Sequence, residues 1–201
     1  MKKIIAVLLL VLAVIAVACH TTSRCHVTSL DRSMIPYKTG DTVYCIDAKG
    51  NRVVLTVTDE TSWWDHYDEY LWEEYRNVYL ESEDGKYTLT LGVQGWNYGN
   101  YSQRRLSVCF DSPFGESCGE AKYDEKGHFK SWSGNSSDTY TQWDVMDSVS
   151  INNRTYYDVA LYYHTQSNLT WHCCYNKTYG TLQMKLDEKP IFTLDTVIFA
   201  K

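Results

Sequence analysis

The sequence predicts a single all-β domain, an antiparallel meander that forms a barrel or a sandwich. The chain holds 17 Tyr, 7 Trp and 5 Phe, and aromatic and β-branched residues favour pleated, half-buried surfaces. Short apolar or alternating stretches are separated by turns that contain Gly, Asp or Asn. After residue 19, no stretch shows a sustained helical period. Many short strands joined by tight turns are typical of closed or double-layered antiparallel sheets.

The expected strands follow one another along the whole domain. The first hairpin joins residues 42–46 and 53–57 through a turn that ends near Gly50. A second joins 77–80 and 87–91, and a third joins 119–123 and 128–132. The last four expected strands cover residues 156–163, 171–175, 181–186 and 192–199. In the final strand, alternate residues would share one face: Phe192, Leu194, Thr196 and Ile198.

One segment can form a short helix instead. Within residues 64–76, Tyr67, Leu71, Trp72 and Tyr75 follow a spacing of three and four residues. The segment is therefore the one candidate helix of an otherwise all-β chain.

The N-terminus predicts export. Lys2 and Lys3 precede an apolar run over residues 4–18, which is shorter than the about 20 residues needed for a comfortable membrane span. A charged start followed by a short apolar run is typical of a secretory signal peptide. An uncleaved anchor helix is the alternative.

The end of the apolar run resembles a bacterial lipobox. Residues 16–19 read Ala-Val-Ala-Cys, and in a lipobox the Cys becomes the acylated first residue of the mature protein. Ala16 stands where Leu is usual, and Ala18 also suits ordinary signal peptidase. The expected organisation is a signal peptide over 1–18, a lipidated tether over 19–34 that starts at Cys19, and a β domain over 35–201.

The charge balance excludes nucleic acid as a partner. The full chain has 19 basic and 25 acidic residues. Cleavage after residue 18 removes Lys2 and Lys3 and leaves 17 basic and 25 acidic residues, a net charge of −8. An acidic domain is poorly suited to nucleic acid or to anionic lipid surfaces, where phosphates require Lys and Arg. The expected partners are the membrane, reached through the N-terminal lipid, and a glycan or an envelope protein.

Three segments resemble a family of small uncharacterised lipoproteins found in Bacteroidetes-type bacteria. These are residues 35–44 with Tyr-Lys-Thr-Gly-Asp, residues 150–159 with Tyr-Tyr, and residues 175–184 with Tyr-Asn-Lys-Thr-Tyr-Gly. Asn153 stands where the family pattern has Gly in the turn. The resemblance implies a lipid-anchored protein of the cell envelope, at the outer membrane, with a β fold. It implies no catalytic residues and no cofactor.

Two short motifs indicate specific chemistry. Residues 115–119 match G-x-S-x-G, the nucleophile elbow of α/β-hydrolases, but that elbow needs a strand–helix turn in a parallel sheet. A Gly-rich turn is the simpler interpretation. His172 beside Cys173 and Cys174 suggests a thiolate–imidazole metal site. No second cluster with matching spacing accompanies it, so no metal is expected.

Six cysteines follow Cys19, and an even set in an oxidising envelope predicts disulfides. Cys109 and Cys118 form the best pair, because a turn between them can bring two strands into register.

The most unusual segment is residues 63–75, where aromatic rings alternate with carboxylates. Flat rings flanked by acids suit a sugar-binding platform, whereas paired carboxylates suit a glycosidase. The alternative is that these aromatic side chains only pack in the core or on the surface, without a ligand. The candidate ligand-binding residues are Trp63, Trp64, Tyr67, Tyr70 and Trp72.

The leading hypothesis is a non-enzymatic binding or accessory domain tethered to the envelope, with a glycan or peptide ligand. A hydrolase of envelope or other polysaccharide is one alternative. A structural partner of an outer-membrane complex is another.

Overall fold

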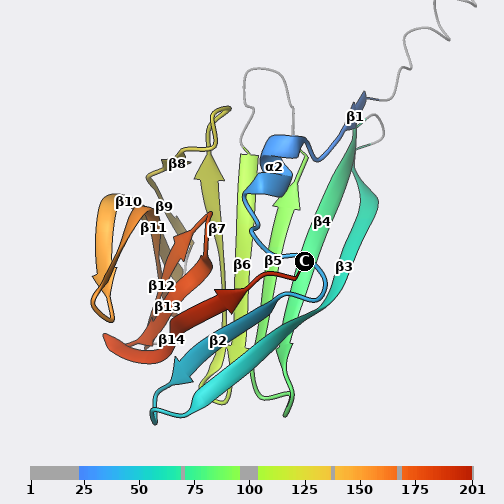
Figure 1. Ribbon diagram of the computed structural model, residues 1–201. Helices are drawn as coiled ribbons and strands as arrows, with labels where there is room; N and C mark the ends of the chain where they lie inside the picture. Colours follow the sequence, from blue (N-terminus) through green and yellow to red (C-terminus); the bar gives the residue numbers. More distant parts are fainter. Residues whose placement is uncertain (1–22, 69–70, 96–103, 137–138, 167–168, 201) are drawn as a thin grey trace, which may run out of the picture.

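The computed structural model describes residues 23–68, 71–95, 104–136, 139–166 and 169–200. These residues form antiparallel strands with one short helix (Figure 1). The elements are β1 (Ser23–Cys25), α2 (Ser29–Ser33), β2 (Thr42–Asp47), β3 (Arg52–Asp68), β4 (Leu71–Ser82), β5 (Thr88–Gln94), β6 (Arg104–Ser112), β7 (Gly115–Tyr123), β8 (Phe129–Lys130), β9 (Trp132–Ser136), β10 (Thr139–Ile151), β11 (Arg154–Gln166), β12 (Leu169–Asn176), β13 (Gly180–Leu186) and β14 (Lys189–Ile198).

The strands form one curled sheet in the order β8-β7-β6-β5-β4-β3-β2-β14-β13-β12-β11-β10-β9. From β2 to β8 and from β9 to β14, strands that follow each other in sequence are neighbours, and β14 returns to pair with β2. The sheet bends until β7 and β8 contact β10 and β11, which gives a nearly closed barrel. The predicted all-β meander is thereby confirmed.

The core lies between the two halves of the curled sheet. Phe110 on β6 and Phe192 on β14 have ring centroids 4.9 Å apart, and Tyr87 lies against both. In Figure 1, β2 and β14 cross in front of β5 and β6. Burial of large aromatic side chains is the main source of stability in such a core.

The helix expected within residues 64–76 is wrong. This segment forms the ends of β3 and β4, which pair in register with Trp63 opposite Tyr75 and His66 opposite Trp72. Aromatic side chains gain packing from cross-strand partners, and the backbone of both strands is paired along the hairpin. The helical spacing of Leu71 and Tyr75 was therefore coincidental.

The folded domain begins earlier than the expected boundary at Ile35. β1 pairs in parallel with β4, with Ser23 opposite Leu71. After it, Thr28 caps α2 in a capping box with Asp31. Met34 is fully buried and its carbonyl accepts a hydrogen bond of 2.5 Å from the Tyr175 hydroxyl. The part of the expected tether that the structure describes, residues 23–34, is thus packed onto the barrel.

Asp31 fixes this N-terminal segment to the sheet. Its carboxylate is fully buried, 2.6 Å from the Arg104 guanidinium, and it accepts a 2.8 Å hydrogen bond from the Tyr123 hydroxyl. Burial alone raises the pKa of Asp31. Hydrogen bonds from Arg104, Thr28 and Tyr123 outweigh that effect and hold the pKa below its usual range.

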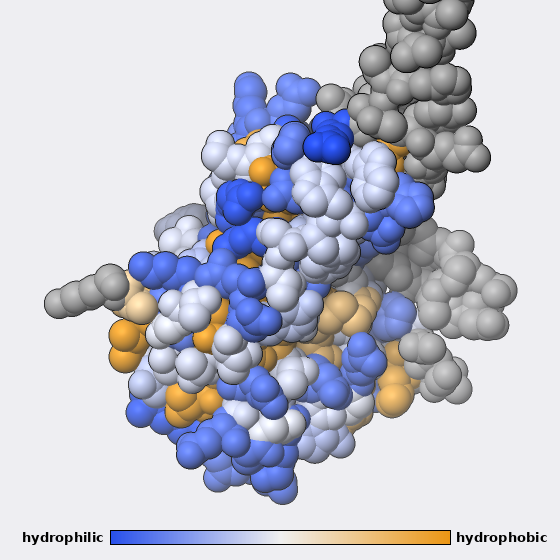
Figure 2. Space-filling model, turned by 90° about the vertical axis from the view of Figure 1, so that its right-hand side faces the viewer, coloured by the Kyte–Doolittle hydropathy of each residue, from blue (hydrophilic) through white to orange (hydrophobic). Residues whose placement is uncertain are grey.

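The outer surface of the barrel is mostly polar. Figure 2 looks onto the side that lies at the right of Figure 1, where β3 and β4 run, and its hydrophobic residues occur as separate small patches. Such scattered apolar residues are normal on a folded domain. The local features of this surface, rather than one large patch, therefore decide where a partner can bind.

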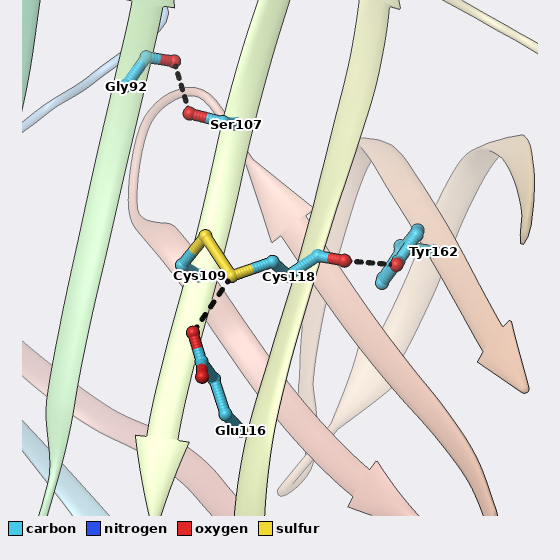
Figure 3. The surroundings of a disulfide bond; sticks show 6 residues. All are labelled: Gly92, Ser107, Cys109, Glu116, Cys118 and Tyr162. Atoms are coloured by element: carbon cyan, nitrogen blue, oxygen red, sulfur yellow. Dashed lines mark hydrogen bonds between the residues drawn. A yellow bond between two sulfur atoms is a disulfide. The ribbon is translucent and has the colours of Figure 1, made fainter. Parts of the chain in front are cut away.

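The predicted disulfide between Cys109 and Cys118 is confirmed. The two residues face each other on β6 and β7, with Cα atoms 4.0 Å apart. Figure 3 shows the bond between the strands and the Cys118 carbonyl pointing at the Tyr162 hydroxyl, which donates a hydrogen bond to it. Tyr162 lies on β11, so this contact joins the disulfide to the opposite side of the barrel.

Removal of this bond should destabilise the fold. Chain entropy for the short loop gives roughly 2–3 kcal/mol, so the Cys109→Ser/Cys118→Ser variant should unfold at a lower denaturant concentration than the wild type. Addition of a reductant should shift the wild type toward the variant and leave the variant unchanged. Detection of both as unmodified thiols in native peptide mapping would contradict the bond.

A second prediction concerns Asp31. The Asp31→Asn substitution removes the charge opposite Arg104 and should lower the free energy of unfolding at neutral pH by roughly 2–3 kcal/mol. The folded-state pKa is depressed, so this stabilisation is present above the unfolded pKa and is lost as pH falls through the lower folded value. The difference from wild type should therefore shrink below about pH 4. Asp59→Asn, at an exposed position, is the control. If the free energies of unfolding of the wild type and Asp31→Asn differ equally at pH 3 and at pH 7, the charge-based role of Asp31 is disproved.

Candidate functional site

The aromatic segment forms a hairpin with two different faces. Side chains alternate across a strand, so Trp63 and Trp64 lie on opposite faces of β3. Trp63 shares its face with Tyr75, and Trp64 shares the other face with His66 and Trp72. The three tryptophans are exposed, at 39%, 38% and 36% for Trp63, Trp64 and Trp72. The single platform of adjacent rings expected from the sequence is thus divided into two surfaces.

Two of the candidate residues contribute nothing to this description. Tyr70 lies outside the described residues, and for Tyr67 only the backbone, as part of β3, is described. Cys19 also lies outside them.

The first surface is a ring pair beside a polar pocket. The rings of Trp63 and Tyr75 are stacked, with centroids 5.4 Å apart and planes 10° from parallel. Tyr75 also lines a shallow pocket of about 80 Å³. Its lining includes two amides, a guanidinium, two hydroxyls and a carboxylate, and the lining residues are Tyr75, Asn77, Gly92, Val93, Gln94, Arg105, Ser107 and Glu120.

A buried carboxylate holds Tyr75 in place. Glu73 is fully buried, and its Oε2 accepts hydrogen bonds from the Tyr75 hydroxyl at 3.2 Å and from the Gln94 amide. Gln94 also donates to the Tyr75 oxygen at 2.8 Å. Burial and the nearby Glu73 charge raise the pKa of Tyr75 to about 12. The phenol therefore stays protonated, and the ring under Trp63 has a fixed orientation.

Glu73 also has an unused oxygen. Its Oε1 is buried and has no hydrogen-bond partner among the described residues. A buried acceptor of this kind costs free energy unless a donor reaches it. Glu73 is two residues away from Tyr75, the cross-strand partner of Trp63. Side chains two residues apart lie on the same face of a strand, so Glu73 and Tyr75 share one face of β4.

The second surface is more apolar. Arg24, Trp64 and Trp72 line a slot of about 170 Å³. Arg24 lies opposite Trp72 in the β1–β4 register and places its guanidinium 5.9 Å from the centroid of the Trp64 ring. His26 contacts the edge of Trp64 at 4.9 Å. Two rings and a cation therefore meet at the point where the described chain begins.

The G-x-S-x-G motif has a structural explanation. Ser117 lies within β7, is 2% exposed, and its hydroxyl has no partner among the described residues. A Cβ added at Gly119 would lie 2.2 Å from the Tyr162 ring, so this glycine permits the close approach of β11. Gly115 has φ of +118° in the turn after β6, a conformation that favours glycine. No strand–helix elbow is formed, and the arrangement lacks the geometry of a hydrolase nucleophile.

The neighbouring thiols are also in the interior. Cys173 and Cys174 are both buried, and burial raises the pKa of Cys174 to about 11 and that of Cys173 well above its usual range. His172 packs edge-on against Tyr163 at 4.7 Å. Within the described ranges, no group of three or more His, Cys, Asp or Glu side chains is arranged to hold a metal.

A larger cavity lies at the opposite end of the barrel. A groove of about 810 Å³ is bordered by the β2–β3, β4–β5 and β6–β7 turns. Two of its carboxylates are engaged by their own turns: Asp47 accepts from Lys49 and Asn51, and Asp84 accepts from Lys86 and Ser82. The groove is of ligand size, and Glu83 is its third acid.

The chain matches no known protein-family model, no curated protein and no solved structure. Among the residues that the structure describes, no helix has the length and apolar character required to cross a bilayer. A function must therefore be argued from the surfaces described above.

Sequence reasoning missed the residues that complete both surfaces. Gln94, Arg105 and Glu120 lie on β5, β6 and β7, and Arg24 lies in the segment that was expected to be a tether. Only the strand order brings them to the aromatic hairpin, and no local pattern marks them.

Proposed function

We propose that the protein is a lipid-anchored domain of the bacterial cell envelope, attached through Cys19, which binds a glycan without catalysing a reaction. The observation that carries the binding role is the exposed Trp63 ring, stacked on the half-buried Tyr75 beside the polar pocket of Gln94, Arg105 and Glu120.

This arrangement fits the chemistry of a sugar. A pyranose has an apolar face, which an exposed aromatic ring can cover, and a rim of hydroxyls that both donate and accept hydrogen bonds. Trp63 offers the ring. Asn77 and Gln94 offer amides, and Arg105 and Glu120, which form an ion pair with each other at 3.0 Å, offer a charged edge on the same side. Tyr75 is held rigid by Glu73, and a rigid platform loses less entropy on binding.

The alternatives have less support. A serine hydrolase would need Ser117 exposed beside a base, whereas it is buried in β7. A glycosidase would need two carboxylates facing each other across a cleft, and the pocket beside Tyr75 contains one acid, Glu120, among its lining residues. A peptide is the second ligand class that a ring pair beside polar groups suits.

The anchor is tested by the Cys19→Ala substitution. Loss of the acylated residue should release the protein from the membrane fraction, because the lipid on Cys19 is the main attachment in this proposal. The measurement is membrane fractionation with mass determination of the mature N-terminus. Complete sedimentation of the variant with membranes, or a mature N-terminus at another residue, would end the lipoprotein proposal.

The ligand face is tested by the Trp63→Ala substitution. Binding of soluble oligosaccharides, including peptidoglycan fragments and glucan and xylan oligomers, is measured by calorimetry. Loss of the stacking ring should weaken binding by about tenfold, roughly 1.4 kcal/mol. Trp72→Ala on the other face is the matched control and should leave affinity unchanged. Equal losses in both variants, or binding of peptides but of no oligosaccharide, would overturn the glycan proposal.

A further inference from the structure

The second face of the hairpin is composed differently from the glycan-binding candidate. Trp64 and Trp72 are exposed, and the slot between them and Arg24 is almost wholly apolar apart from the guanidinium. His66 lies against Trp72 with centroids 4.9 Å apart. Tryptophan with a nearby cation is the composition of surfaces that lie at a membrane interface, where an apolar ring and a polar edge meet both phases.

This face is held rigidly by the segment that enters the fold. Glu74, opposite Trp64 on β4, accepts a 3.0 Å hydrogen bond from the Val27 amide and a 3.3 Å bond from the Arg32 guanidinium. β1 is held against the hairpin by its pairing with β4, and the residues that follow β1 are held by these two hydrogen bonds to Glu74. Trp64, Trp72 and Arg24 therefore form one preorganised unit.

The length of chain before β1 places this unit close to the anchor. Three residues lie between Cys19 and Ser23, and a fully extended chain spans about 3.5 Å per residue, so these four steps place the two at most roughly 14 Å apart. Arg24 is the next residue and already lines the slot. A lipid on Cys19 thus brings the Trp64–Trp72 face to the membrane surface, while the groove bordered by the β2–β3 and β4–β5 turns lies at the other end of the barrel.

We propose that the surface formed by Arg24, Trp64 and Trp72 docks into the phospholipid headgroup layer of the membrane that holds the Cys19 anchor. This inference rests on the anchor of the proposed function and is independent of the glycan site. Docking adds a second contact to the lipid and sets the orientation of the barrel, with the groove at the far end directed away from the membrane. The domain as a whole is acidic, but Arg24 supplies a local cation beside the two rings, and this cation pairs with lipid phosphates.

The test is depth-dependent quenching of tryptophan fluorescence. The full chain is placed in phosphatidylethanolamine–phosphatidylglycerol vesicles that carry lipids brominated near the headgroup. The wild type should be quenched, and Trp64→Phe/Trp72→Phe should lose most of that quenching. Trp63→Phe, on the opposite face of the same strand, is the matched control and should keep it. Circular dichroism confirms that each variant is folded.

A second variant tests the cation. Arg24→Glu leaves both rings in place and should reduce the quenching in phosphatidylglycerol-containing vesicles by placing a carboxylate against lipid phosphates. Equal quenching of the wild type and the Trp64→Phe/Trp72→Phe variant would overturn the docking proposal. Absence of quenching in a wild type that is shown to be lipid-linked and membrane-bound would also overturn it. A change in the fluorescence of Trp64 and Trp72 on addition of soluble oligosaccharide, but not of vesicles, would also overturn the docking proposal and would make this face a ligand site. A wild type without a lipid on Cys19 would instead refute the anchor itself.

Discussion

The pairing of β14 with β2 is the contact on which the rest of the molecule depends. β2 to β8 form one continuous meander and β9 to β14 form another, and only this pairing joins the two into one sheet. The joined sheet then curls so that Phe110 and Phe192 meet in a common core. Without the pairing, each half would leave its apolar face exposed to water. The link spans nearly the whole chain, so it carries a large loop-closure cost that the core must offset.

The N-terminal segment depends on this barrel in turn. Asp31 lies in α2, a helix that is too short to be stable alone. Its carboxylate contacts Arg104 of β6 and Tyr123 of β7. A buried charge is tolerated because these partners satisfy it. The same contacts determine where the chain leaves the domain, and so where an anchored barrel faces its membrane.

Strand alternation then separates two surfaces on one hairpin. Adjacent tryptophans, Trp63 and Trp64, point to opposite sides of β3. Each recruits partners from strands that are distant in sequence: Trp63 acquires the polar groups of β5 to β7, and Trp64 acquires Arg24 of β1. One hairpin therefore carries the proposed ligand surface on one side and the proposed lipid-facing surface on the other.

The sequence by itself determined the strand character of the domain, the turns with positive-φ glycines such as Gly50 and Gly85, and the Cys109–Cys118 pair, because each depends on residues close together in the chain. It failed where distant strands decided the outcome. The helical spacing around Leu71 lost to cross-strand pairing, and the polar segment before Ile35 became buried structure. β6 and β10 were not expected as strands. Which face each tryptophan occupies, and which amides, acids and cations surround it, was decided by sheet order and register, since these bring residues together whose sequence separation hides any relation between them.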